Sequence, residues 1–90
     1  MIWTIKRTDS FIISFSRFRD NPVILRELEK KIKRLKQDPS HVGGWLHGTL
    51  HGKRSTRIAQ KYRLIFTIDE QSHIVYLLFI DHREDVYHRT

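Results

Sequence analysis

The second half of the chain carries three strand-like segments spaced so closely that only one kind of sheet can contain them. These segments are residues 55–59 (STRIA), 62–68 (YRLIFTI) and 73–81 (HIVYLLFID). Each segment combines β-branched and aromatic residues in a pattern typical of strands. Because only short connections separate them, we expect consecutive strands to pair as antiparallel hairpins. The third segment is apolar on both faces, which favours a central position in the sheet.

The first half of the chain predicts a strand and then a helix. Residues 1–7 (MIWTIKR) alternate like a short first strand. Residues 8–19 (TDSFIISFSRFR) follow with helical periodicity, and Thr8 or Asp9 is suited to cap the start of the helix. Four apolar residues share the predicted stripe of this helix: Phe11, Ile12, Phe15 and Phe18.

A second helix is predicted over residues 22–38. Asn21 is a good N-cap, Pro22 suits the first helical position, and Pro39 ends the helix at the preceding residue. Its apolar stripe consists of Ile24, Leu25, Leu28, Ile32 and Leu35. The basic residues that crowd its C-terminal half favour a solvated face over an RNA contact, because exposed helix faces are routinely charged. Together with the helix predicted over residues 8–19, it is expected to form an αα-hairpin.

Residues 39–54 form a loop that contains all four glycines of the chain. We expect Trp45, Leu46 and Leu50 to anchor this loop in the core, with Trp45 acting as a core residue and not as a platform for a base. The resulting order is β-α-α-β-β-β. We therefore predict one α+β domain over residues 1–90, in which the helical hairpin covers one face of a mainly antiparallel sheet.

Composition restricts the partners of the protein. The chain has 90 residues, 17 Lys and Arg against 10 Asp and Glu, a formal net charge of +7 and no cysteine. It offers no disulfide or thiolate chemistry, and its first residues do not resemble a signal peptide. The apolar run from Ile74 to Ile80 is too short to cross a bilayer. The excess of positive charge favours nucleic acid as a partner, ahead of a merely soluble surface or an acidic protein.

Strand alternation brings two arginines together. If residues 59–61 form a three-residue hairpin loop, Arg57 stands opposite Arg63 on the face that the helices leave open. Like charges directly opposite one another destabilise a strand pair, so we expect an anion to bind between them. Two alternatives stay open: in one, an arginine reaches a carboxylate such as Asp81 or Glu84, and in the other, a two-residue turn separates the pair.

The segment after the third strand, DHREDVY, adds three reactive residues at the same end of the sheet: His82, Arg83 and Tyr87. Cleavage of RNA by its own 2′-hydroxyl requires no metal. It requires a base, cations that stabilise the phosphorane, and an acid for the leaving 5′ oxygen. Arginine binds phosphate bidentately, histidine titrates near neutrality, and tyrosine acts as a base or stacks on a nucleobase. We predict that Arg57, Arg63, His82, Arg83 and Tyr87 form a catalytic set.

The remaining basic residues of the hairpin region are expected to contact RNA: Lys53, Arg54, Lys61 and His51. A metal site is not predicted, because the spacing of His41, His47 and His51 matches no zinc pattern and no cysteine is present. We expect no cofactor.

The second half of the chain resembles the RelE/ParE superfamily of type II toxins over roughly residues 43–87. Three segments carry the resemblance: TLHGKR, the arginine-bearing hairpin TRIAQKYRLIF, and the closing HREDVY. The resemblance implies a toxin that an antitoxin holds inactive. RelE-like members cut messenger RNA in the ribosomal A site, whereas ParE-like members poison DNA gyrase by binding it.

By this resemblance, Arg57 and Arg63 match the basic residues that hold the phosphate, and Arg83 matches the arginine after the last strand. Tyr87 matches the C-terminal aromatic residue, and His82 occupies a position where the superfamily often has histidine. The chain lacks the glutamate that precedes the hairpin in YoeB-like members, and it has fewer lysines than RelE on the first hairpin strand. The general base is therefore open among Tyr87, His82 and a loop histidine.

The resemblance thus implies a cytoplasmic, metal-independent endoribonuclease with an antitoxin, the ribosome and messenger RNA as partners. A gyrase inhibitor of the ParE kind is the alternative, and a relative that binds RNA or a protein without cleavage is a third.

Overall fold

The structure is a computed structural model that describes the backbone of residues 2–89, together with the side chains of this range other than those of residues 49 and 87–89. In chain order, its elements are β1 (Thr4–Arg7), α1 (Asp9–Phe15), α2 (Pro22–Gln37), η1 (Pro39–His41), β2 (Gly44–Trp45), η2 (Gly48–Leu50), β3 (Arg54–Ile58), β4 (Tyr62–Asp69), β5 (Ile74–His82) and α3 (Arg83–Arg89). Within this described part, no helix combines the length and apolar character needed to cross a membrane.

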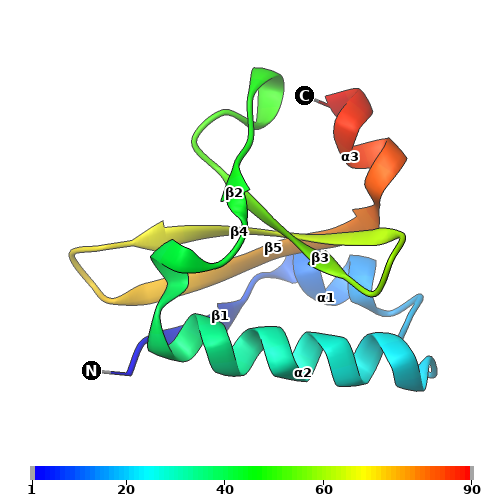
Figure 1. Ribbon diagram of the computed structural model, residues 1–90, viewed down its shortest axis with the longest axis horizontal. Coiled ribbons are helices and arrows are strands. Elements are labelled where there is room, and N and C mark those ends of the chain that lie inside the picture. Colours follow the sequence, from blue (N-terminus) through cyan, green and yellow to red (C-terminus); the bar gives the residue numbers. More distant parts are fainter. Residues whose placement is uncertain (1, 90) are drawn as a thin grey trace.

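The strands form one sheet in the order β1-β5-β4-β3-β2 (Figure 1). The three predicted strands β3, β4 and β5 pair as consecutive antiparallel hairpins, and β2 extends the sheet beside β3. β1 is the exception, because it pairs with β5 in parallel. β5 therefore lies between two strands, which confirms the interior position that its apolar sequence predicts.

Helices α1 and α2 lie on the same side of this sheet (Figure 1). The core between the helices and the sheet consists of Phe11, Ile24, Leu28, Leu35, Val42, Ile58, Leu64, Phe66, Val75, Leu77 and Ile80. In β4 the alternate residues Leu64 and Phe66 face the helices, as their spacing predicts. The prediction of an α+β fold with a helical hairpin on one face of a mainly antiparallel sheet is confirmed.

Local signals in the sequence explain the bounds of α2. The Asn21 side-chain oxygen accepts hydrogen bonds from the backbone N–H groups of Val23 and Ile24, at 3.1 and 3.2 Å. The helix ends at Gln37, where the approach of Pro39 disfavours helical backbone at the preceding residue. The lysines at positions 30, 33 and 36 are exposed, so the outward face of α2 is the solvated charged face that the sequence predicts.

Helix α1 is shorter than the sequence predicts. It ends at Phe15, and Phe18 lies beyond it with its ring edge against Tyr62. Phe11 and Phe15 stack with their ring centroids 5.5 Å apart, whereas Ile12 is 55% exposed and does not belong to the buried stripe. The β-branched residues and serines, which weaken helix propensity, are consistent with this early end.

Polar groups of α1 extend the edge of the sheet beyond β1. The Thr8 hydroxyl donates to the Leu77 carbonyl at 2.8 Å, and the Ser14 hydroxyl oxygen accepts the Ile80 N–H at 3.0 Å. The Ser14 bond satisfies a backbone N–H of β5 beyond Leu77, the last residue of β5 that pairs with β1. Both bonds also place the residues that follow α1 beside the C-terminal end of β5.

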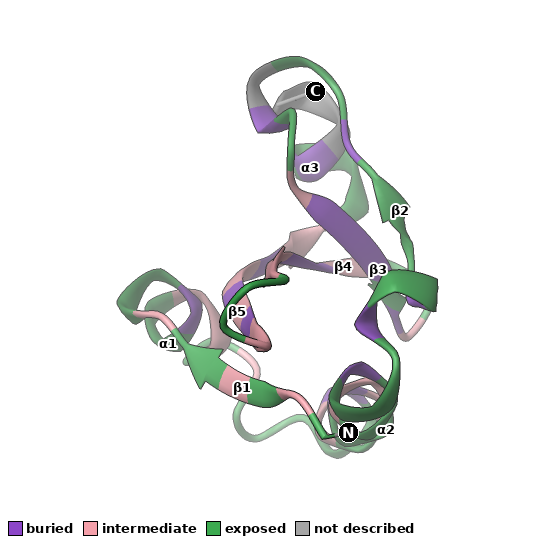
Figure 2. Ribbon diagram, turned by 90° about the vertical axis from the view of Figure 1, so that its left-hand side faces the viewer, coloured by how far each residue is buried: buried purple, intermediate pink, exposed green. Residues whose placement is uncertain are grey.

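A second, smaller core lies on the other face of the sheet and contains Leu46, Leu50, Ile65 and Val86. Leu46 and Leu50 come from the predicted loop, so their expected role as anchors is confirmed. Val86 comes from α3, which with η2 lies on the opposite side of the sheet from α2 (Figure 1). Figure 2 shows the buried residues of both cores along the strands and the exposed outer surfaces of the helices.

The predicted order β-α-α-β-β-β contains no helix after the last strand, so α3 was not predicted. The His82 ring accepts the Glu84 N–H through Nδ1 at 3.2 Å, which caps the start of this helix. Glu84 and Asp85 occupy the first turn, where negative side chains complement the helix dipole. That pair of acidic residues after a polar cap was a helix signal in the sequence.

Candidate functional site

The hairpin of β3 and β4 places two arginines side by side. Arg57 is the direct partner of Arg63 in the strand register, and Ile58 is the partner of Tyr62. Ile58 and Leu64 belong to the core beneath the helices. Arg57 and Arg63 each precede one of these residues in its strand, so both arginines face the other side of the sheet. The predicted register is confirmed, and it rests on a turn that holds Ala59 at a positive φ of 53°.

The two arginines differ in their surroundings. Arg57 is exposed, and Arg63 is half-buried, with its Nη1 donating to the Ser55 hydroxyl oxygen at 3.4 Å. Within the described residues, Arg57 has no hydrogen-bond or ion-pair partner. Its guanidinium is therefore the group of the pair that is open to an anion from solvent.

A carboxylate extends this row onto the next strand. Asp81 of β5 is the direct partner of Arg63, so Arg57, Arg63 and Asp81 form a line across three strands. The Asp81 side chain is only 13% exposed and accepts a hydrogen bond from Arg17 Nη2 at 3.2 Å. Asp81 is one of the carboxylates that was expected to pair with Arg57 or Arg63, and it also binds a third cation, Arg17. We name Arg57, Arg63 and Asp81 the arginine row.

The positive field of the arginine row reaches helix α2. Burial lowers the pKa of Lys31 below its ordinary value, and the charges of Arg34, Arg57 and Arg63 lower it further. Glu27 acts in the opposite direction and does not reverse the shift. Arg57 and Arg63 are the smallest of these contributions, so the charge of the two arginines acts only weakly at α2.

His82 does not join the arginine row. It is the strand partner of Tyr62, so its side chain lies on the helix-covered face, where the ring meets Tyr62 edge-on at 5.7 Å between centroids. Its Nδ1 already accepts the N–H that caps α3. The structure therefore does not support the predicted grouping of His82 with the two arginines.

Arg83 and Tyr87 belong to α3. Arg83 is exposed at the first position of this helix, and its N–H donates to the Lys61 carbonyl at 2.8 Å. This bond fixes the start of α3 beside the turn of the hairpin that carries the arginine row. Tyr87 is part of the helical backbone, but its predicted position near the arginines lies outside the described side chains.

Of the residues expected to contact RNA, Arg54 has a different role. Its side chain is 7% exposed, and Nη2 donates to the carbonyls of Ser40, Val42 and Gly43 at 3.0 to 3.1 Å. A buried guanidinium with three carbonyl partners cannot also bind a phosphate at the surface. The prediction for Arg54 is wrong because, in this register, it lies on the helix-covered face and fastens the loop that precedes β2.

The other three residues of that set remain accessible. Lys61 is exposed in the hairpin turn, next to the arginine row, whereas His51 is exposed and Lys53 is half-buried at the opposite end of β3. Among the described side chains, no group of three or more His, Asp or Glu residues is arranged to hold a metal ion.

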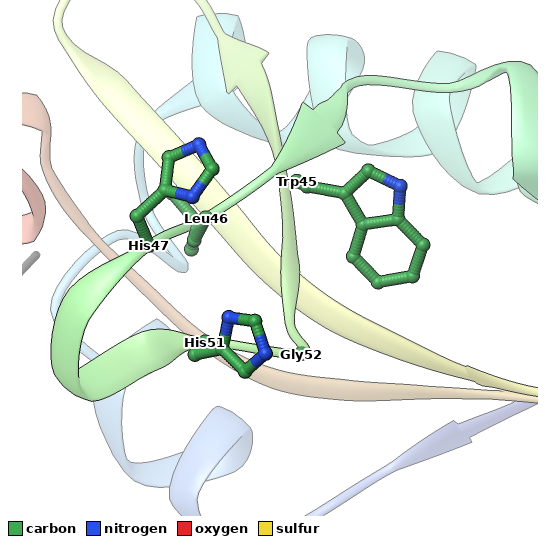
Figure 3. Close-up of a pocket in the computed structure, with 5 residues that line it drawn as sticks. All are labelled: Trp45, Leu46, His47, His51 and Gly52. Atoms are coloured by element: carbon green, nitrogen blue, oxygen red, sulfur yellow. The ribbon is translucent and has the colours of Figure 1, made fainter.

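Trp45 is not the core anchor that the sequence suggests. It is 64% exposed at the edge of the sheet, where it lies over the Arg54 guanidinium at 4.9 Å from the ring centroid. A hollow of about 440 Å³ beside it is lined by Trp45, Leu46, His47, His51 and Gly52 (Figure 3). The short strand β2 was missed, and with it the edge position that exposes this ring.

The fold is shared with small bacterial toxins of known structure. A chain of the RelBE2 toxin–antitoxin complex from Mycobacterium tuberculosis is 28% identical, with a TM-score of 0.76 over 92% of this chain and 100% of that chain. The Escherichia coli toxin RelE, solved as a variant in the free state, is 16% identical, with a TM-score of 0.73 over 99% and 94% of the two chains. A chain of the YoeB–YefM complex from Staphylococcus aureus is 17% identical, with a TM-score of 0.72 over 92% and 99%.

The sequence itself matches the profile of the family described as "ParE toxin of type II toxin-antitoxin system, parDE" over residues 5–87. The chain therefore belongs to the ParE toxin family of type II toxin–antitoxin systems, within the RelE/ParE superfamily. No curated protein sequence matches it significantly.

Proposed function

We propose that this toxin is a ribosome-dependent endoribonuclease that cleaves messenger RNA in the A site. The observation that carries the proposal is the pairing of Arg57 with Arg63 on the open face of the sheet. A strand pair with like charges directly opposite one another is unfavourable by itself. A phosphodiester bound between the two guanidinium groups reverses this effect, because each can donate two hydrogen bonds to phosphate oxygens.

The reaction in this proposal is attack by the 2′-hydroxyl of the RNA on the adjacent phosphorus. A base takes the 2′-hydroxyl proton as the new O–P bond gives a pentacoordinate phosphorane. The bond to the 5′ oxygen then breaks as an acid protonates that oxygen, which leaves a 2′,3′-cyclic phosphate and a free 5′-hydroxyl. Arg57 and Arg63 stabilise the charge of the phosphorane, and no metal is needed. Arg83 supplies a further cation near the leaving oxygen.

Tyr87 is our candidate for the group that acts on the 2′-hydroxyl or stacks on the adjacent base. The choice follows from His82, whose Nδ1 is engaged in capping α3 and whose ring faces Tyr62. A loop histidine such as His51 is the remaining candidate for the general base. Its place beyond the far end of β3 argues against direct contact with the phosphate at Arg57.

The partners follow from the family and from the proposed substrate. An antitoxin is the expected protein partner, since the relatives from M. tuberculosis and S. aureus were solved as toxin–antitoxin complexes. The ribosome and messenger RNA are the proposed targets, and the cytoplasm is then the site of action.

Inhibition of DNA gyrase by binding is the second candidate, and the match to the ParE family is the observation that favours it. An inhibitor of this kind would need the surface of the protein but not a reactive group at Tyr87. Removal of the Tyr87 hydroxyl should therefore reduce the activity of a ribonuclease but not that of a gyrase inhibitor.

The test incubates the toxin with translating ribosomes and maps the 5′ ends of the transcript. We expect codon-positioned cleavage that Arg57→Ala and Arg63→Ala abolish and that Tyr87→Phe strongly reduces. Arg26→Ala, which removes an exposed arginine of α2, is the matched control and should cleave normally. A parallel gyrase supercoiling assay that shows inhibition insensitive to Tyr87→Phe, with no new transcript ends, would establish the second candidate instead.

A further inference from the structure

We infer that Trp45 and the hollow beside it bind an unpaired nucleobase of the RNA, away from the proposed cleavage position. This inference rests on the proposed function, since it assigns a second contact for the same substrate. Trp45 is a large aromatic side chain that is 64% exposed on a strand of only two residues. Nothing in the packing of the core requires an aromatic side chain there.

The ring of Trp45 is held in place from below. The Arg54 guanidinium lies 4.9 Å from the ring centroid and is fixed by its hydrogen bonds to three backbone carbonyls. The following residue, Leu46, is buried in the second core and fixes the backbone. A flat ring with one face on a fixed cation and the other toward solvent is already in the geometry that stacking on a base requires.

The hollow next to Trp45 adds volume and partners for a base. Its volume is about 440 Å³, and the side chains of His47 and His51 flank it with Leu46 and Gly52 (Figure 3). Both histidines are exposed. Imidazole rings can stack on a base and can also donate or accept hydrogen bonds at its edges, as proteins that read single-stranded RNA do.

The charge around the hollow favours RNA over a protein side chain as its occupant. Lys53 directly follows Gly52 of the hollow, and no acidic residue lies in the sequence between Asp38 and Asp69. The apolar lining alone would also suit an aliphatic anchor from an antitoxin. A polyanion is the better fit, because every charged residue of this stretch is basic and part of it already forms the arginine row.

The sheet edge offers a path between the two sites. Trp45 is the strand partner of Arg54 and shares its face of the sheet, whereas Arg57 and Arg63 lie on the opposite face. Arg57 is three residues from Arg54, a distance of about 10 Å along an extended strand. A single strand of RNA that contacts both sites therefore crosses the edge of the sheet between the exposed Arg57 and Trp45.

The fluorescence of Trp45 provides a direct test, because the chain has only two tryptophans. Trp3 stacks on His73 with ring centroids 4.4 Å apart, so Trp3→Phe leaves Trp45 as the sole reporter and is also the matched control. We expect a short 2′-O-methyl oligoribonucleotide, which cannot be cleaved, to quench this reporter. An abasic unit at the position whose base stacks on Trp45 should weaken the quenching more than an abasic unit at any other position of the oligonucleotide.

Affinity for the same oligonucleotide should weaken about five- to a hundredfold in Trp45→Leu, the range that loss of one base–aromatic stack produces. Trp45→Phe should lose less, because it keeps a flat ring over Arg54. Thermal unfolding of both variants separates a binding defect from a folding defect.

The inference is overturned if the oligonucleotide does not quench Trp45, or if Trp45→Leu binds it as tightly as the parent protein. It is equally overturned if Trp45→Leu loses affinity for the antitoxin alone, which would assign the hollow to the protein partner. These outcomes are separate from the cleavage assay. Binding that depends on Trp45 without cleavage would refute the proposed function and keep the base site.

Discussion

At the scale of single residues, the arginine row places two positive charges directly opposite one another. Arg57 and Arg63 are direct partners in an antiparallel pair, and a directly opposed pair of like charges destabilises a sheet by roughly 0.2–1 kcal/mol. Ser55 and Asp81 lie next to Arg63, while Arg57 is exposed to solvent. We interpret the opposed charges as a binding site that is unfavourable when empty and relieved when a phosphate is bound.

Replacement of Arg57 by glutamine should therefore stabilise the free protein and inactivate it. We expect Arg57→Gln to raise the free energy of unfolding in urea by roughly 0.2–1 kcal/mol, since it removes the opposed charge. Added sulfate or phosphate should stabilise the parent protein more than this variant. Arg26→Gln, on the exposed surface of α2, should show neither effect. A less stable Arg57→Gln protein would mean that the pair is not in conflict.

Arg54, in contrast to Arg57, stabilises the fold, because its buried guanidinium donates hydrogen bonds to three backbone carbonyls. Arg54→Met keeps much of the side-chain volume but leaves the carbonyls of Val42 and Gly43 without a donor. We expect a loss of about 2–4 kcal/mol in the free energy of unfolding, since hydrogen bonds from charged groups are worth about 1.5–3 kcal/mol each and not all of that is lost when loops relax.

Chemical denaturation measures this loss, and Lys53→Met at the neighbouring position is the control that should change stability little. If Arg54→Met unfolds at the same denaturant concentration as the parent protein, the loop does not depend on the guanidinium. In that case Arg54 would again be available as a ligand for phosphate.

At the scale of elements, the close approach of β3 constrains the backbone that connects η1 to β2. Gly43 has a φ of +66°, a value that residues with a Cβ seldom adopt, and a Cβ at this position would overlap the Ser55 carbonyl group. Gly44, the next residue, has open space around the position of a Cβ. The two adjacent glycines are thus a matched pair for the same substitution.

Gly43→Ala should destabilise the protein by at least about 2 kcal/mol, because it combines an unfavourable φ with a clash against backbone that cannot move freely. Gly44→Ala should change the free energy of unfolding by less than about 1 kcal/mol. Thermal unfolding followed by circular dichroism compares the two. Equal effects would show that the approach of β2 to β3 is looser than the structure indicates.

The elements that could be predicted from sequence are those whose signals are local. Short connections fix the hairpins of β3, β4 and β5, and alternation then fixes the facing of Arg57 and Arg63. The cap at Asn21 and the stop before Pro39 fix α2 in the same way.

Trp45 and Arg54 were misjudged because their positions depend on tertiary contacts, whereas α3 was missed although its cap and acidic first turn are local signals. A two-residue strand such as β2 has too few residues to show a period, so its pairing with β3 cannot be foreseen, nor can the exposure of Trp45. Arg54 looked like one more surface cation until the register placed it on the buried face. His82 appeared near the arginines along the sequence, but strand alternation turns it to the other side.

At the scale of the whole molecule, the two faces of the sheet carry different kinds of positive charge. The exposed lysines of α2, such as Lys30 and Lys33, lie on the helix-covered side and on the outer face of that helix. The cations of the hairpin, Arg57, Lys61 and Arg63, lie in a stretch of sequence without acidic residues. Only the second group adjoins the proposed path of the RNA.

The salt dependence of RNA binding distinguishes these two groups. For single-stranded nucleic acid, the logarithm of the binding constant falls against the logarithm of the salt concentration with a slope of about −0.7 for each phosphate that a cation neutralises. Lys61→Gln should therefore make the slope less steep by about 0.7, because it removes one contact from the hairpin turn. Lys30→Gln carries the same change of net charge on α2 and should leave the slope unaltered. Titration of the 2′-O-methyl oligoribonucleotide at several salt concentrations measures both. Equal slopes for the two variants would mean that the protein attracts RNA through its overall charge of +7. The open face of the sheet would then not be the specific binding surface.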